Sequence, residues 1–205
     1  MARETEVKIR ISNPRSIRNQ LKGLRLVEIH KRTLEDNVLF DTPDRTLRKA
    51  RCILRLRRYG SRWWITYKGT PDADPHYKSR VELETEVTDP AAVRGIFQAL
   101  GLVPVFRYQK YRAQFAPQAL LHGRKPRLEV ALDETPIGDF MELEGSRAAI
   151  DRIARQFGYS HRDYSTASYG ALYLEECRKE NRTPTDMVFQ RGRKHARQRS
   201  GRSRA

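Results

Sequence analysis

The chain has 205 residues, a length that suits one domain of barrel size or one domain with a tail. Hydrophobic residues make up 38% and charged residues 32%, and no apolar run approaches the roughly 18 residues that a membrane-spanning helix needs. The formal net charge of +16 favours polyanionic partners such as nucleic acid, phosphates or an anionic surface.

Part of this charge lies near the C-terminus. Residues 191–204 hold six arginines, one lysine and no acid, and the rest of the chain still carries +9. We expect residues 1–180 to form the folded domain and residues 181–205 to form a disordered basic tail. The alternative for the tail is an arm that makes non-specific contacts with RNA or DNA.

The cysteines and the first residues indicate the compartment. Cys52 and Cys177 are far apart and have no metal-ligand spacing, so we expect two free thiols, with one disulfide as the alternative. The first residues contain no apolar leader segment. We therefore expect a soluble cytoplasmic protein without membrane contact, either a monomer or a homodimer.

Period-2 segments, the pattern of strands with two different faces, dominate the chain as far as residue 144. They predict strands over residues 4–11, 27–40, 51–59, 62–68, 77–87, 104–115, 127–133 and 139–144. Eight strands are an even number that is compatible with a closed barrel.

Helices are predicted between and after these strands. Asn13 and Asp89 are capping residues that are each followed by a proline, Ser146 starts a third helix, and Ser165 or Thr166 starts the last. The expected helices cover residues 14–24, 91–100, 147–157 and from 165 or 166 to about 180. The predicted fold class is α+β: a closed eight-stranded antiparallel β-barrel with flanking α-helices.

The first predicted strand separates its side chains into a charged face and an apolar face. Glu4, Glu6, Lys8 and Arg10 share one face, because successive side chains alternate across a strand. A sheet with one solvated face explains a single strand of this kind. Since the layout recurs in most of the other strands, a barrel with its apolar side under the helices would place the charges in its lumen. Such an arrangement is costly unless the charges are paired or ligated.

These lumen charges are sorted by sign along the strands. The strands at 51–59, 62–68 and 104–115 contribute mainly cations, and those at 77–87, 127–133 and 139–144 contribute mainly carboxylates. Arginine and lysine bind phosphate oxygens, and clustered carboxylates hold hard cations such as Mg²⁺ or Mn²⁺. A lumen with both suits a metal-bound polyphosphate.

Seven segments then match known motifs in order. They are E-x-E-x-K at 4–8, F-D-T-P-D at 40–44 with L-R-x-R at 54–57, T-x-K-G at 66–69, R-x-E-x-E at 80–84, K-x-R at 110–112, Asp133 followed by G-x-F-x-E-x-E at 138–144, and S-Y at 168–169. Together they resemble the CYTH, or triphosphate tunnel metalloenzyme, family. The resemblance covers residues 4–175 and leaves the basic tail outside.

The resemblance implies a role for each matched residue. The triphosphate would be held by Lys8, Arg55, Arg57, Lys68, Arg80, Lys110 and Arg112. Divalent metal, Mg²⁺ or Mn²⁺, would be held by Glu4, Glu6, Glu82, Glu84, Asp133, Glu142 and Glu144, with Glu129 as an additional candidate. The catalytic residues would be Glu4, Glu6, Lys8 and Lys68.

The family includes class IV adenylate cyclases and thiamine, inorganic and RNA triphosphatases, so the resemblance implies an enzyme acting on a triphosphate. We expect hydrolysis of a small triphosphate: inorganic triphosphate, thiamine triphosphate or a nucleoside triphosphate. One alternative is a class IV adenylate cyclase, although no segment visibly supplies a purine pocket. We interpret Trp63 and Trp64 as packing between strand and helix, with a base-stacking platform as the alternative. Another alternative is a non-catalytic module that binds polyphosphate or RNA.

Overall fold

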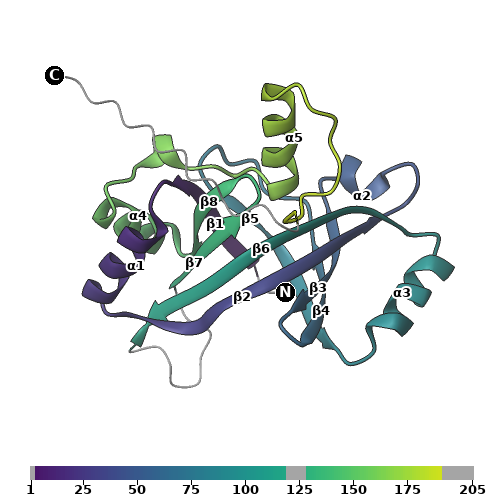
Figure 1. Ribbon diagram of the computed structural model, residues 1–205, viewed down its shortest axis with the longest axis horizontal. Helices are drawn as coiled ribbons and strands as arrows, with labels where there is room; N and C mark the ends of the chain where they lie inside the picture. Colours follow the sequence, from purple (N-terminus) through teal and green to yellow (C-terminus); the bar gives the residue numbers. More distant parts are fainter. Residues whose placement is uncertain (1–2, 119–127, 191–205) are drawn as a thin grey trace.

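A computed structural model describes residues 3–118 and 128–190 (Figure 1). Eight strands form a closed barrel in which every neighbouring pair is antiparallel, which confirms the predicted fold class. The order around the barrel is β1-β5-β4-β3-β2-β6-β7-β8. The strands are β1 Arg3–Ile11, β2 Leu26–Asp41, β3 Ile53–Tyr59, β4 Arg62–Lys68, β5 Lys78–Val87, β6 Val103–Pro117, β7 Leu128–Thr135 and β8 Gly138–Gly145.

Three of the longer helices begin where the capping residues predict. The side chains of Asn13, Asp89 and Ser146 accept hydrogen bonds from backbone N–H groups of the first turns. These helices are α1 Pro14–Gly23, α3 Pro90–Ala99 and α4 Arg147–Gln156, and a further helix, α5 Tyr169–Lys179, lies near the end of the described chain. No described helix has the length and apolar character that crossing a membrane requires.

Two element starts and two short helical segments differ from the sequence prediction. The last helix starts after Ser168, because Ser165 forms a β-bridge with Lys8 and the chain there is extended. A short helix, α2 Thr46–Lys49, was not predicted; the Asp41 carboxylate accepts hydrogen bonds from two of its backbone N–H groups, at 2.8 and 2.9 Å. β3 begins after Arg51, whose positive φ of 59° interrupts the extended chain. A 3₁₀ turn, η2 His161–Asp163, precedes α5.

The helices cover the apolar outer side of the barrel. Val7 of β1 is completely buried together with Leu21 of α1 and Ile150 of α4. On another side, the ring of Phe97 in α3 lies 4.9 Å from that of Phe40 in β2. The apolar faces therefore point outward beneath helices, and the charged faces point into the lumen, as the alternation predicts.

The helix α5 covers one end of the lumen, and Figure 1 shows it standing over the strands. Its residues Tyr169, Tyr173 and Cys177 are buried in a cluster that includes Phe140 of β8. Phe140 is on the same face of β8 as Glu142. The row of charged side chains on this face is therefore followed by an apolar cluster under α5.

The chain after α5 continues along the barrel. Met187 is 1% exposed and packs with the α5 cluster. Its backbone N–H donates to the carbonyl of Arg107 at 3.0 Å, and its carbonyl accepts from the N–H of Gln109 at 2.9 Å. Residues 181–190, which we expected to be part of a disordered tail, thus contain a stretch paired with β6. The strongly basic residues 191–205, with their predicted disorder and nucleic-acid contact, lie outside the described residues.

Candidate active site in the barrel lumen

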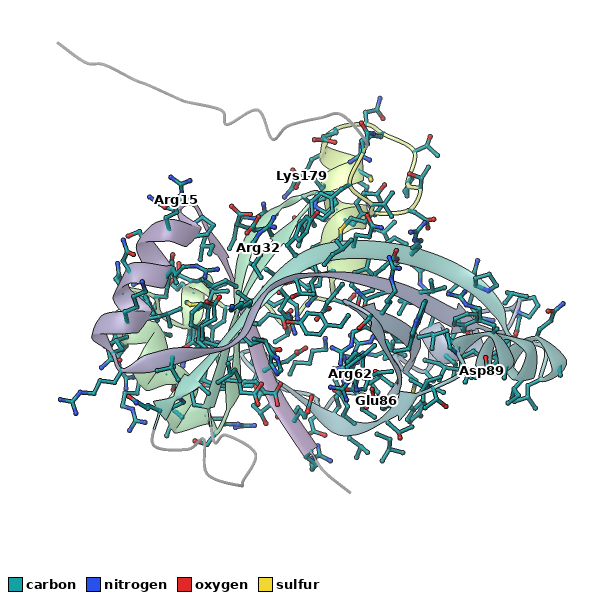
Figure 2. All side chains as sticks on the ribbon, turned by 60° about the horizontal axis from the view of Figure 1, so that its bottom comes forward. Arg15, Arg32, Arg62, Glu86, Asp89 and Lys179 are labelled. Atoms are coloured by element: carbon teal, nitrogen blue, oxygen red, sulfur yellow. The ribbon has the colours of Figure 1, made fainter. Side chains whose placement is uncertain are left out.

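The lumen contains a cavity of about 640 Å³ that receives side chains from all eight strands. Every predicted phosphate-binding cation lines it: Lys8, Arg55, Arg57, Lys68, Arg80, Lys110 and Arg112. The predicted metal ligands Glu4, Glu6, Glu82, Glu84, Glu142 and Glu144, and also Glu129, line it too. Figure 2 shows side chains filling the space between the strands.

Lys8 of β1 is buried in the wall between two carboxylates. Its Nζ lies 3.3 Å from Glu6 and 3.3 Å from Glu142, and 5.3 Å from the ring centre of Tyr169. Burial opposes the charged form, but Glu142 and Glu6 raise the pKa of Lys8 above its ordinary value. Lys8 is therefore a fixed positive charge at neutral pH.

Asp133 of β7 is on the same strand face as Glu129, but it does not line the cavity and is 1% exposed. It accepts hydrogen bonds from Lys110 Nζ at 2.9 Å, Arg112 Nε at 2.7 Å and the Tyr169 hydroxyl at 2.6 Å. Asp133 is thus a shared acceptor for two lumen cations and for the Tyr169 hydroxyl of α5. The Arg112 guanidinium also pairs with Glu142.

Glu35 of β2 is a lumen residue that the sequence analysis missed. It is 1% exposed and lies 3.6 Å from Arg57, 3.6 Å from Lys110 and 3.7 Å from Arg112. Burial disfavours its ionised form, but Lys110, Arg112 and Arg57 together lower the pKa of Glu35 to about 2. In the sequence, Thr33, Glu35 and Asn37 form a polar row at alternating positions. This row is hard to recognise because Asp36, which faces outward, is also charged.

Glu84 of β5 holds two arginines of β3. Arg57 Nη2 donates to it at 2.9 Å and Arg55 Nη2 at 3.4 Å, while the Thr66 hydroxyl donates at 2.6 Å. Arg55 is also hydrogen-bonded to the Tyr108 hydroxyl at 3.4 Å. These bonds fix the directions in which both guanidinium groups point.

A second missed residue is Lys78, at the start of β5. It is buried, and its Nζ lies 3.0 Å from Glu6. Burial lowers the pKa of Lys78 to about 8, although Glu6 opposes that shift. Burial likewise opposes ionisation of Glu6, but Lys8 and Lys78 hold the pKa of Glu6 well below its ordinary value. Lys78 precedes Arg80 by two positions, so the alternation in β5 would have found it.

Lys68 of β4 links two predicted metal ligands. Its Nζ forms an ion pair with Glu82 and lies 3.9 Å from Glu4. Burial, together with the neighbouring Glu4, raises the pKa of Glu82 above its ordinary value despite the contact with Lys68. This part of the wall thus holds a carboxylate whose proton affinity exceeds that of Glu6.

Three carboxylates stand in one row across neighbouring strands. Glu6, Glu144 and Glu129 are register partners on β1, β8 and β7, and directly opposite side chains lie about 4.5–5.5 Å apart at Cβ. Among the residues that the structure describes, no three acidic, histidine or cysteine side chains form a group placed to hold a metal. The donor set is nevertheless all carboxylate, the type that suits Mg²⁺ or Mn²⁺.

A known protein family matches most of this chain. The sequence profile of the CYTH domain matches residues 2–169. The chain belongs to the CYTH family. A protein of Methanocaldococcus jannaschii named "putative adenylate cyclase" is 32% identical over 149 residues, which are 72% of this chain and 79% of that protein.

Solved structures share the CYTH fold. One from Vibrio parahaemolyticus, described as a "putative adenylate cyclase", has a TM-score of 0.69 at 23% identity and covers 82% of this chain and 95% of its own. Another, from Hippeastrum, is described as an adenylyl cyclase candidate with a dominant triphosphatase activity; its TM-score is 0.57 at 19% identity, with 84% and 96% covered. As a CYTH protein, this chain is an enzyme of the family that acts on triphosphates with a divalent metal.

Proposed function

We propose that this CYTH protein hydrolyses a small triphosphate in a reaction that depends on Mg²⁺ or Mn²⁺. The observation that supports the proposal is the gathering of nine arginine and lysine side chains of the described residues, together with a set of carboxylates, around one cavity of about 640 Å³. A triphosphate carries about four negative charges, and arginine and lysine at fixed positions neutralise such charge without reorganising.

The proposed phosphate-binding residues are those predicted from the sequence: Lys8, Arg55, Arg57, Lys68, Arg80, Lys110 and Arg112. Their side chains are held by carboxylates before substrate arrives, as the pairs of Arg57 with Glu84 and of Lys110 with Asp133 illustrate. Such preorganisation lets the cations stabilise charge that develops on the transferred phosphoryl group.

The proposed metal-binding residues are Glu4, Glu6, Glu82, Glu84, Glu142 and Glu144, with Glu129 beside them in the row. We propose Asp133, which does not line the cavity, as a positioning residue for Lys110, Arg112 and Tyr169, from which its oxygens accept hydrogen bonds. A bound divalent ion would supply charge neutralisation at the phosphate oxygens. Glu6 stays ionised at neutral pH, so it can orient the attacking water by accepting a hydrogen bond.

Adenylate cyclase activity is the second candidate. The relative from M. jannaschii that is 32% identical to this chain bears that name. Cyclisation uses the same binding of the triphosphate but takes the ribose 3′ hydroxyl as nucleophile in place of water.

The proposed compartment is the cytoplasm. Cys52 and Cys177 are both free thiols, which is compatible with that compartment.

A product assay separates the two activities. Inorganic triphosphate, thiamine triphosphate, ATP and GTP are incubated with the full chain and Mg²⁺ or Mn²⁺, and orthophosphate, pyrophosphate and cyclic nucleotide are measured. Metal-dependent orthophosphate supports hydrolysis, whereas equal amounts of pyrophosphate and cyclic AMP support the cyclase. If no substrate gives any of these products, the proposed function is wrong.

A further inference from the structure

Aromatic side chains gather at one part of the cavity wall. His30 of β2, Tyr59 of β3 and Trp64 of β4 all line the lumen, and we call these three residues the aromatic mouth. The ring centres of Tyr59 and Trp64 are 6.3 Å apart, and those of His30 and Tyr59 are 6.0 Å apart. Residues 60–61, the turn between β3 and β4, and Arg62 at the start of β4 also line the cavity.

Trp64 differs from its neighbour Trp63 in the side to which it points. Trp63 packs on the outer apolar cluster with Phe97 of α3, and the guanidinium of Arg94 lies 5.6 Å from its ring centre. Trp64 takes the opposite face of β4 and lines the cavity, opposite Arg57 in the register. In the described part of the chain, Trp64 joins none of the apolar clusters. Packing therefore accounts for Trp63 and leaves Trp64 without that explanation.

The aromatic mouth adjoins the cations of the lumen. The guanidinium of Arg57 lies 5.4 Å from the ring centre of Trp64 and is hydrogen-bonded to Glu84 at 2.9 Å. If Arg57 binds a phosphate, the organic group attached to that phosphate would therefore lie close to the indole of Trp64. The register of β3 and β4 thus places a phosphate-binding cation next to an aromatic ring.

A second arginine, Arg62, also contacts the ring of Trp64, and its side chain is exposed. Arg62 lies 5.0 Å from the indole centre and forms an ion pair with Glu86, and both side chains are largely exposed. Figure 2 shows the two residues of this pair close together, Arg62 at the start of β4 and Glu86 near the end of β5. Exposed ion pairs contribute little to stability, so Arg62 can make room for a ring on the indole or stack on that ring itself.

We propose that the aromatic mouth binds the planar heteroaromatic group of an organic triphosphate and so selects it over inorganic triphosphate. This inference rests on the proposed function and narrows its substrate class. Stacking on Trp64 would hold the ring, while Arg57 and the other lumen cations hold the phosphates. The purine pocket that no segment of the sequence displays would be assembled from three strands.

The neighbouring tryptophans provide a matched pair of variants. In Trp64→Leu, kcat/KM and affinity for ATP or thiamine triphosphate should fall by about 10–100-fold, while both stay within about twofold for inorganic triphosphate. Trp63→Phe should leave all three substrates unchanged. An equal loss for inorganic triphosphate, or no loss for either organic substrate, would overturn the inference while the proposed function stands.

A binding measurement gives a readout that does not depend on turnover. In Trp63→Phe, Trp64 is the remaining tryptophan, since the chain contains two. ATP or thiamine triphosphate should quench its fluorescence in a saturable manner, and inorganic triphosphate should do so much less. Equal quenching by all three would overturn the inference; failure of the unsubstituted protein to bind or convert any of them would remove the proposed function as well.

Discussion

Glu6 stands where the cation set and the carboxylate row meet. It contacts Lys8 and Lys78 and is the register partner of Glu144. We expect Glu6→Gln to lower metal-dependent turnover by at least about 100-fold while the protein stays folded, because the amide is a weaker metal ligand and carries no charge. Glu28→Gln, at an exposed position of β2, is the control. Unchanged turnover at saturating Mg²⁺ would contradict the metal assignment.

Glu35 makes the stability of the barrel depend on pH. Its pKa of about 2 is lower than in an unfolded chain, so its contribution is present above pH 4.5 and is lost as pH falls through the folded value. Glu35→Gln should destabilise the protein by about 3 kcal/mol at pH 7, and the difference should shrink toward pH 2. Urea unfolding at several pH values measures it, again with Glu28→Gln as control. A difference that does not change with pH would show that Glu35 is not ionised in the folded protein.

At the scale of elements, α5 and the strands of the lumen depend on each other. Tyr169 of α5 donates to buried Asp133, and burial together with Asp133 raises the pKa of this phenol well above its ordinary value. The residues after α5 then pair with β6 through Met187. The folded part of the chain therefore extends beyond the predicted boundary at residue 180.

This extension leads to a prediction about stability. Met187→Ala should lower the free energy of unfolding by about 2–4 kcal/mol, because a completely buried side chain is removed from the α5 cluster. Gln190→Ala, at an exposed position nearby, should have no comparable effect. Chemical unfolding of both variants tests the prediction. Equal stability of the two would mean that residues 181–190 do not support the barrel.

At the scale of the whole molecule, the barrel is held by charges that pair across strands. Arg57 of β3, for example, pairs with Glu84 of β5 and Glu35 of β2. Such pairs offset the repulsion among the lumen cations, but burial of each ion costs solvation free energy. A triphosphate with its metal would bring further counter-charges to the same cavity.

Ligand binding should therefore stabilise the whole protein. Triphosphate with Mg²⁺ at a hundredfold excess over Kd adds about 2.7 kcal/mol, which corresponds to a rise of roughly 5–10 °C in Tm. The rise should require both components, be absent with a monophosphate, and shrink in Arg57→Ala. Thermal unfolding followed by circular dichroism measures it. If Tm does not move at millimolar triphosphate and Mg²⁺, the lumen is not a triphosphate site.

The sequence by itself determined the barrel and most of its wall. Alternation is a local property, so Lys8, Arg57 and Glu142 could be assigned to one face without any knowledge of their neighbours. The caps at Asn13 and Asp89 are equally local, which is why those helices begin where they were predicted. The order of the motifs then identified the family.

Only the tertiary structure decided which charged side chains pair with one another and which buried residues hydrogen-bond to the side chains of the lumen. Glu35 faces the lumen from a strand whose pairing with β6 shifts register between Glu28 and His30 and between His30 and Thr33, so a count of alternating positions from its start fails. Asp133 is predicted on the charged face of β7, but only the fold shows that it accepts hydrogen bonds from Arg112 of β6 and Tyr169 of α5. Met187 pairs with residues about 80 positions earlier in the chain. Contacts at such separation depend on closure of the barrel, which leaves no periodic signal in the segments that it joins.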